Sequence, residues 1–198
     1  MGELVVTLDV DWAPDDAIGA VAARLEDAGV AATWFVTHAG PALDRLRERE
    51  AFELGIHPNF RPGSTHGATP AEVLEHLMAL VPEAVSSRAH GVVQSGALLH
   101  ELVARTPVRI DSTTFLPDMA HVRPLPQHTP HGTLVRIPFV WSDDYEPLRP
   151  RPTDWDELLA RPGLQVVLFH PVHVVRDPRL LDSLLERADG ARRLCDVA

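Results

Sequence analysis

The sequence predicts an α/β fold in which about seven parallel strands form a distorted barrel. Short apolar segments rich in β-branched residues alternate with amphipathic helical segments along the 198 residues, and such alternation indicates a parallel sheet with right-handed crossovers. No glycine-rich phosphate-binding turn follows the first strand, which disfavours the doubly wound open sheet as the competing topology. A chain of this length buries more than about two-thirds of its unfolded surface, so one domain spanning residues 1–198 is expected.

The predicted elements alternate along the chain. The first strand is Glu3–Val10, and the helix after it has apolar residues at helical spacing until Gly29 stops it. The helix from Thr69 has Pro70 at its first helical position and Glu72 three residues after the cap, which is typical of a capping box. The other predicted strands are residues 31–38, 51–57, 85–92, 107–115, 133–141 and 163–170, and the other predicted helices are residues 41–50, 95–106, 153–160 and 178–190.

Residues 116–133 break this regularity. Five prolines or glycines and three histidines fall within this segment, which therefore predicts a long irregular loop. Long ordered loops are often functional.

The composition excludes several function classes. A formal net charge of −10 disfavours a nucleic-acid partner, because phosphate backbones require a concentrated basic face. No apolar stretch approaches the roughly 20 residues that span a bilayer, and aspartates interrupt the first apolar run, so neither a membrane partner nor a signal peptide is expected. Cytoplasmic residence is the corresponding expectation. The lone Cys195 cannot form an intramolecular disulfide.

Polar residues fall at the predicted strand exits. In a parallel barrel the carboxyl ends of the strands meet on one face, so residues distant in sequence become neighbours there. The sequence therefore predicts a site at this rim. The polar and aromatic side chains at the exits are Asp9, Asp11, His57, Arg88, His90, Asp111, Trp141, Asp143, His170 and His173.

The first two aspartates and two histidines suggest a metal site. Asp9 and Asp11 point to the same side of an extended strand, so one can ligate an ion while the other accepts a proton. His57 lies at a strand exit, and the turn-rich stretch after it could fold His66 back towards it. Imidazoles with a carboxylate form a common open zinc site.

Three later residues suggest acid chemistry and charge pairing. His170 and His173 follow the most apolar strand, where an imidazole with a pKa near 6.5 is suited to proton delivery. Arg88 keeps its proton in any ordinary setting, so at a buried strand exit it requires a carboxylate partner. Asp9 is the candidate partner.

The order of these residues resembles the polysaccharide deacetylase family, also called carbohydrate esterase family 4 or the NodB-homology fold, over most of the chain. That family opens with a strand ending in paired aspartates, similar to VTLDVDWAPDD here. The resemblance implies that Asp9 is the general base and Asp11 a metal ligand. The family's last motif, Leu-x-His, is similar to LFH, which implies that His170 is the general acid.

The second and third family motifs are altered in this chain. His-x-x-x-His supplies two metal ligands in the family, but only His57 matches, because position 61 is Arg61. Either His66 takes the second role across a longer turn or His90 from the next strand does; the predicted ligand set contains His66, and His90 is grouped with substrate binding. SSRAHGVVQS resembles the family's Arg-x-Pro-x-Gly, with Arg88 keeping the charge beside the catalytic aspartate.

The fourth family motif, an aspartate and a tryptophan near a late strand, is similar to FVWSDD. Trp141 and Asp143 are therefore predicted, with His173, to bind substrate.

The resemblance implies metal-assisted hydrolysis of an N- or O-acetyl group on a saccharide, with zinc as the expected divalent ion. Two alternatives stay open. Allantoinase-like relatives share the fold, so the substrate could be a small cyclic amide. The missing histidine at position 61 also motivates a metal-free, non-catalytic carbohydrate-binding module. The oligomeric state is not predicted.

Overall fold

A computed structural model describes residues 2–198, and in this range nine strands form one curled sheet in the order β6-β7-β5-β4-β3-β2-β1-β9-β8. Every neighbouring pair is parallel except β6 with β7, which form an antiparallel hairpin. The predicted class, an α/β fold with a curled and mainly parallel sheet, is confirmed. The strands are β1 (Glu3–Asp9), β2 (Ala32–Val36), β3 (Phe52–Ile56), β4 (Ser86–Ser87), β5 (Ile110–Asp111), β6 (Leu125–Thr129), β7 (Gly132–Arg136), β8 (Trp141–Ser142) and β9 (Leu164–Phe169).

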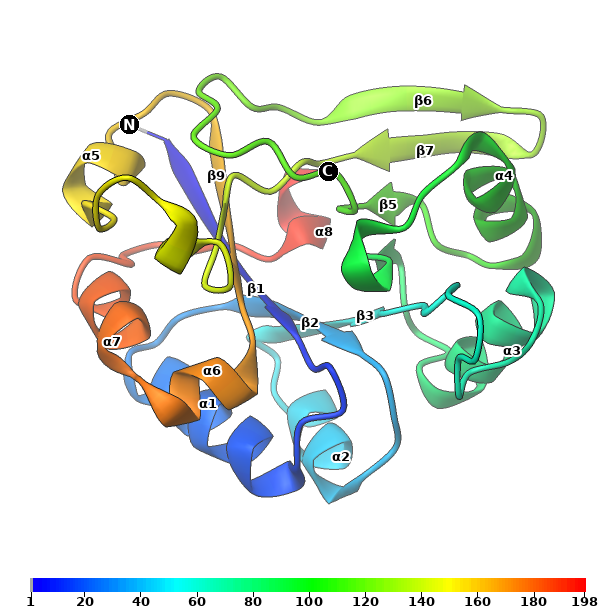
Figure 1. The fold of residues 1–198 in the computed structure, drawn as a ribbon, viewed down its shortest axis with the longest axis horizontal. Helices are drawn as coiled ribbons and strands as arrows, with labels where there is room; N and C mark the ends of the chain where they lie inside the picture. Colours follow the sequence, from blue (N-terminus) through cyan, green and yellow to red (C-terminus); the bar gives the residue numbers. More distant parts are fainter. Residues whose placement is uncertain (1) are drawn as a thin grey trace.

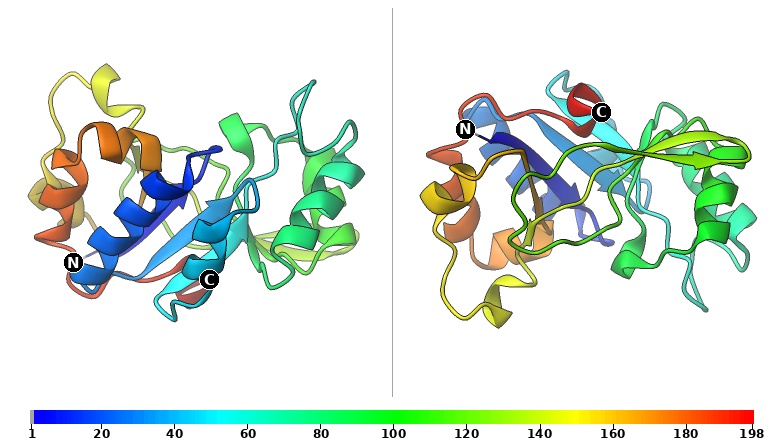
Figure 2. Two further views of the ribbon diagram at one scale, coloured as in Figure 1. Left: turned by 90° about the horizontal axis from the view of Figure 1, so that it is seen from below. Right: turned by 90° about the horizontal axis from the view of Figure 1, so that it is seen from above.

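The helices cover the convex face of this sheet. Figures 1 and 2 show α1, α2 and α6 gathered against the central strands, with α3 and α4 at the opposite end of the molecule from α7. The α-helices are α1 (Asp15–Asp27), α2 (Pro41–Arg47), α3 (Pro70–Leu80), α4 (Gly96–Arg105), α5 (Trp155–Leu159), α6 (Pro171–Arg176), α7 (Arg179–Leu185) and α8 (Leu194–Val197), and the 3-10 helices are η1 (His90–Val92) and η2 (Glu146–Leu148).

The sheet is curled because its two ends are connected by a short segment. Residues 137–140 carry the chain from β7, near one edge, to β8 at the other edge. Five Cα steps span at most roughly 18 Å, so these two ends of the sheet must approach each other. An isolated parallel bridge between Phe115 and Phe139 pairs this segment with the chain after β5. The concave face is thus enclosed by the chain itself.

Alternation along the strands divides the core into two parts. Val6 and Leu8 of β1 pack outward in the helix-covered core, whereas Val5 packs inward with Phe35 and Leu168. Successive strand residues point to opposite faces. Odd-numbered residues of β1 therefore face the concave side, and Asp9 belongs to this set.

Two predicted strands and one predicted loop differ from the observed elements. The strand expected over residues 85–92 is only β4, because Gly91 and Val92 have positive φ angles of 61° and 59° and turn the chain into η1. The strand expected over residues 133–141 is divided into β7 and β8, since Pro138 between them has no N–H for a ladder. The expected loop over residues 116–133 contains β6, which pairs with β7 through a tight turn.

None of the helices within residues 2–198 combines the length and the apolar character needed to cross a membrane.

The predicted capping box at the start of α3 is present. The Thr69 hydroxyl accepts a hydrogen bond from the Glu72 backbone N–H at 3.3 Å, and the Glu72 carboxylate accepts one from the Thr69 N–H at 3.0 Å. We expect Thr69→Ala to lower the free energy of unfolding by about 1 kcal/mol, because it orphans a helical N–H. Urea unfolding monitored by circular dichroism measures this change. Thr69→Ser keeps the hydroxyl and is the matched control; an equal loss in both variants would contradict the role of the cap.

Candidate active site and metal centre

The site lies at the carboxyl end of the parallel strands, on the concave rim. β1 delivers Asp9 there, and β9 delivers His170 just past its end, since Val166 and Leu168 of that strand face the same inner core. His57 follows β3, and Arg88 follows β4. Four strands thus bring distant residues together, as the sequence predicts.

A buried arginine forms the floor of the site. The guanidinium of Arg88, which is 1% exposed, donates to Asp9 Oδ1 at 3.1 Å and to Thr7 Oγ1 at 2.8 Å. It also donates to the carbonyl oxygen of Ser112 at 3.0 Å and to its hydroxyl at 2.9 Å. These contacts fix one oxygen of Asp9 and leave Oδ2 directed towards His57 Nε2 at 3.7 Å.

Aromatic rings complete the surroundings of this guanidinium. Its central carbon lies 4.6 Å from the ring centroids of both Phe35 and Phe139, which is the geometry of cation–π contacts. Burial lowers the pKa of Arg88, and the neighbouring charges of Asp9 and Asp111 oppose that shift. The expected pairing of Arg88 with Asp9 is present in the structure.

Asp11, His57 and His90 form a compact triangle of possible metal ligands. Asp11 Oδ1 lies 3.0 Å from His57 Nε2 and 2.8 Å from His90 Nδ1, and these two nitrogens are 3.3 Å apart. Ligand atoms around a tetrahedral zinc ion with bonds near 2.0 Å are about 3.3 Å apart. One carboxylate and two imidazoles with this spacing fit a divalent transition metal.

Asp11 reaches this triangle through an unusual backbone turn. β1 ends at Asp9, and Asp11 and Trp12 adopt positive φ angles of 45° and 56°. Burial raises the pKa of the Asp11 carboxyl, but the hydrogen bonds and charges of His57 and His90 outweigh it and hold the pKa far below its ordinary value. An ionised carboxylate suits metal ligation.

The structure places His66 outside the triangle. Its Nδ1 accepts a hydrogen bond from the Asn59 backbone N–H at 3.3 Å, and its ring lies 5.3 Å from Trp12 and stacks at 5.4 Å on His76. Its Nε2 is buried without a hydrogen-bond partner among the described residues. The structure therefore groups His90, which is predicted among the substrate-binding residues, and not His66 with Asp11 and His57.

The imidazole of His170 is held by a carboxylate. Its Nδ1 lies 2.6 Å from Asp143 Oδ1, its backbone N–H donates to Oδ2 at 2.8 Å, and Nε2 faces Asp11 Oδ2 at 3.6 Å. Burial lowers the pKa of His170, but the hydrogen bond and charge of Asp143, with Asp9 and Asp11, raise it to about 9. A protonated imidazole aimed at the metal triangle is positioned to act as an acid.

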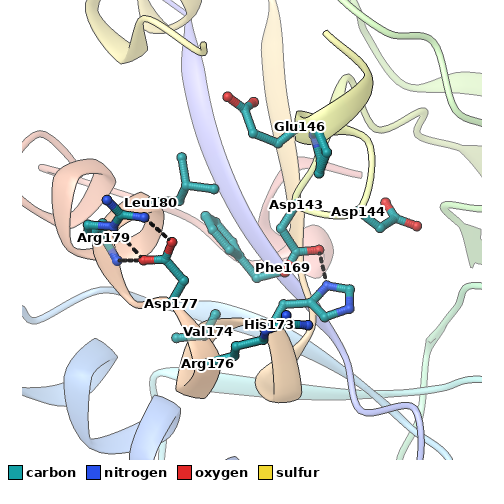
Figure 3. Close-up of a pocket in the computed structure, with 11 residues that line it drawn as sticks. Asp143, Asp144, Glu146, Phe169, His173, Val174, Arg176, Asp177, Arg179 and Leu180 are labelled. Atoms are coloured by element: carbon teal, nitrogen blue, oxygen red, sulfur yellow. Dashed lines mark hydrogen bonds and ion pairs between the residues drawn. The ribbon is translucent and has the colours of Figure 1, made fainter.

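Asp143 and His173 lie at a second cleft on the other side of β9. This cleft of about 760 Å³ contains Phe169 and is bounded by α6 and α7 (Figure 3). Asp143 Oδ1 lies 3.3 Å from His173 Nδ1 as well as next to His170. Asp143 therefore holds the imidazole of His170 from the second cleft and does not line the cavity over the triangle, and its contact with substrate stays a prediction.

Trp141 does not fit its predicted substrate-binding role. It is 0% exposed, and its indole N–H donates to Thr153 Oγ1 at 2.7 Å and to Glu146 Oε2 at 3.0 Å. Its ring packs against Trp155 and Phe169. Trp141 is a core residue in this structure, because β8 directs its side chain towards the helices.

The cavity at the candidate site has a volume of about 350 Å³. Polar residues described above line it together with the rings of Phe115, Phe139 and Tyr145 and the side chain of Leu148. Its charged and imidazole residues are Asp9, Asp11, His57, Arg61, Arg88, His90, Asp144 and His170.

Sequence reasoning missed several residues of the site. The place of Thr7 could have been predicted from the sequence, because it lies two residues before Asp9 on the same strand and its side chain must point to the same face of the sheet. Ser112 directly follows β5, so its place at a strand exit is a sequence signal as well. Phe139 has no such signal, because it lies in the segment between β7 and β8.

A curled, mainly parallel sheet with acidic and imidazole residues on its rim makes this an α/β protein with a candidate active site at the carboxyl ends of its strands. The model of the WbmS-like polysaccharide deacetylase family matches residues 6–184. The chain belongs to this polysaccharide deacetylase family, as the resemblance implies.

Solved structures agree with this assignment. A Bordetella bronchiseptica protein, to which the role of a polysaccharide deacetylase in O-antigen biosynthesis is ascribed, is 30% identical, with 96% of this chain and 86% of that chain covered and a TM-score of 0.79. A carbohydrate esterase family 4 esterase from Streptococcus mutans shares the fold at 17% identity, with 97% and 85% covered and a TM-score of 0.53. No curated protein matches the chain.

A pseudoenzyme has the same fold. A carbohydrate esterase family 4 pseudoenzyme from Bacillus anthracis is 12% identical, with 98% of this chain and 64% of that chain covered and a TM-score of 0.54. This likeness concerns the fold alone.

The Asp143 contact predicts a measurable change in His170. Asp143→Asn removes the largest of the contributions that raise the pKa of His170, while the opposing burial and the charges of Asp9 and Asp11 remain, so we expect that pKa to fall from about 9 towards its ordinary value. NMR titration of the imidazole signals of chelator-treated protein measures the shift. Asp144→Asn, at the exposed neighbour, is the control; an unchanged pKa in Asp143→Asn would contradict the assigned interaction.

Proposed function

We propose that the chain is a metal-dependent hydrolase that removes an N- or O-acetyl group from a carbohydrate. The observation that carries this proposal is the triangle of Asp11, His57 and His90, with the carboxylate of Asp9 and the imidazole of His170 on its borders. The role ascribed to the Bordetella bronchiseptica relative supports a carbohydrate substrate.

The three ligands proposed for the ion are Asp11, His57 and His90. A divalent ion bound there, with zinc as the proposed metal, supplies Lewis-acid polarisation of the acyl carbonyl and lowers the pKa of water. Two imidazoles and one carboxylate leave coordination positions open, as hydrolytic zinc sites require.

Asp9 is the proposed general base. Its Oδ1 is held by Arg88, so Oδ2, which faces His57, is the oxygen available to take a proton from the attacking water. Arg88 itself is a positioning residue, because four of its five N–H groups donate to Asp9, Thr7 and Ser112 and its guanidinium lies between two aromatic rings.

His170 is the proposed general acid. Water adds to the acyl carbon, the bond from that carbon to the leaving nitrogen or oxygen breaks, and Nε2 of His170 gives its proton to the leaving atom. The products are acetate and an amine or alcohol. Asp143 keeps Nδ1 bonded throughout, which directs Nε2 towards the cavity.

The ligand assignment predicts different effects for two histidines. We expect His90→Ala to weaken zinc binding by more than about 100-fold, because removing a ligand exceeds the effect of removing a supporting residue. His66→Ala should keep stoichiometric zinc, since its ring contacts Trp12, His76 and the Asn59 N–H and is outside the triangle. Competition with a chromophoric chelator measures both affinities, and circular dichroism controls for folding. Zinc loss in His66→Ala with retention in His90→Ala would reverse the assignment.

The catalytic proposal is tested on wild-type protein and Asp9→Asn. Release of acetate from N-acetylated and O-acetylated sugars should stop on chelation and return with zinc. Asp9→Asn should keep bound zinc but lose at least about 100-fold in kcat, because it lacks a basic oxygen. Asp16→Asn, an exposed position on α1, is the control.

Two results would overturn this proposal. One is full activity after removal of the metal. The other is no stoichiometric metal and no hydrolysis at all, which would favour a non-catalytic carbohydrate-binding module. Hydrolysis of a cyclic amide in place of the acetylated sugars would keep the chemistry and change the substrate.

A further inference from the structure

Arg61 lines the catalytic cavity in the position where the family pattern has a second histidine, four residues after His57. Its guanidinium lies flat against Gly91, next to His90. A Cβ built on Gly91 would lie 2.4 Å from Nη2 and 2.8 Å from Cζ of Arg61. Gly91 also has a φ of 61°, so glycine there provides both the backbone turn and the space for the guanidinium.

The donors of Arg61 are free. No carboxylate of residues 2–198 lies within 4.0 Å of its guanidinium nitrogens, and only its backbone groups take part in hydrogen bonds with those residues. Arg88, the other guanidinium at the cavity, has four of its five N–H groups on Thr7, Asp9 and Ser112. Arg61 is therefore the arginine of the cavity wall whose guanidinium has no partner among residues 2–198 and is fully available to a ligand.

The charges of the wall favour an anion once a metal is bound. Asp9 is paired with Arg88, and His170 with Asp143. The unpaired charged residues of the lining are Asp11, Asp144 and Arg61. With a divalent ion bound at Asp11, their charges and that of the ion add up to a net charge of plus one. A positive cavity in a chain of net charge −10 concentrates anions at the site and repels cations.

We propose that Arg61 recognises an anionic group of the substrate, so that the sugar carries a carboxylate or a phosphate close to the acyl group to be removed. This inference rests on the proposed function. A guanidinium forms two parallel hydrogen bonds with either anion, which fixes the orientation of the group as well as attracting it. Arg61 is thus assigned as a specificity-determining residue.

The kinetic test compares three acetamido sugars that differ in charge. The probes are neutral 2-acetamido-2-deoxyglucose, the corresponding uronic acid, and the corresponding sugar 1-phosphate, each with zinc-loaded wild-type, Arg61→Gln and Arg61→Lys protein. We expect wild type to prefer one of the anionic sugars, and Arg61→Gln to reduce the anionic-to-neutral ratio of kcat/KM by about 10-fold to 100-fold, the effect of losing charge-assisted hydrogen bonds. The change should fall mainly on KM. Arg61→Lys should keep part of the preference for the anionic sugar, because it keeps the positive charge.

Arg123→Gln is the matched control. Arg123 is also exposed, and it follows Val122, which bridges to Gly163 at the start of β9, the opposite end of the sheet from the site. Arg123→Gln should leave the anionic-to-neutral ratio of kcat/KM unchanged. The two anionic probes separate a sugar acid from a sugar phosphate, because only the probe with its anion at the correct place will show the Arg61-dependent preference.

A binding measurement separates this inference from the proposed function. Calorimetric titration of the same three sugars into zinc-loaded wild type and Arg61→Gln needs no turnover. If wild type binds an anionic sugar more tightly than the neutral one and Arg61→Gln abolishes this preference, the inference is supported. If no acetate is released in the same experiments, only the proposed hydrolysis is refuted. An unchanged ratio in Arg61→Gln, or equal binding of neutral and anionic sugars by wild type, would overturn the inference.

Discussion

The buried ion pair between Arg88 and Asp9 is the constraint on which the site depends. Both groups lie in the concave core, where an unpaired charge is costly and removal of one partner of such a pair typically costs about 3–5 kcal/mol. The structure compensates with four hydrogen bonds from the guanidinium and two aromatic rings across its faces. These contacts connect β1, β2, the chain after β4 and the chain after β5. This one ion pair therefore holds segments from several strands in register at the rim.

The same pair explains why two aspartates separated by one residue have different surroundings. Asp9 continues the alternation of β1 and meets Arg88 at the bottom of the cavity. Asp11 leaves that alternation at a residue with positive φ and meets two imidazoles instead. A carboxylate already bound to a guanidinium is a poor competitor for a metal ion. The backbone turn between the two aspartates thus separates the proposed base from the proposed ligand.

Much of this arrangement was predictable from residues that directly follow strands. Asp9, His57, Arg88 and His170 meet because parallel strands end at one rim, which is a property of topology and not of detailed packing. Predictions failed where the backbone left regular structure. His90, in place of the predicted His66, completes the triangle because Gly91 and Val92 adopt left-handed backbone conformations. The hydrophobic periodicity of a sequence does not reveal such conformations. The substrate-binding assignment of Trp141 failed because the segment interrupted by Pro138 crosses from β7 to the other edge of the sheet. β6 was expected as loop because Pro124, Pro126 and Pro130 lie in or beside it, and an edge strand tolerates proline.

The altered second motif connects the ligand set to the substrate. His90 presents Nδ1, the nitrogen nearer its own backbone, so that backbone must lie closer to the ion than in a site that uses Nε2. The turn at Gly91 provides this approach and leaves a surface without a Cβ beside the ligand. A histidine at position 61 is then unnecessary for the triangle, and the guanidinium of Arg61 occupies the surface that Gly91 leaves open. Because His90 takes the place of a histidine at position 61 in the triangle, the guanidinium of Arg61 lies beside the proposed metal centre. There we propose that it selects among acetylated sugars by their charge.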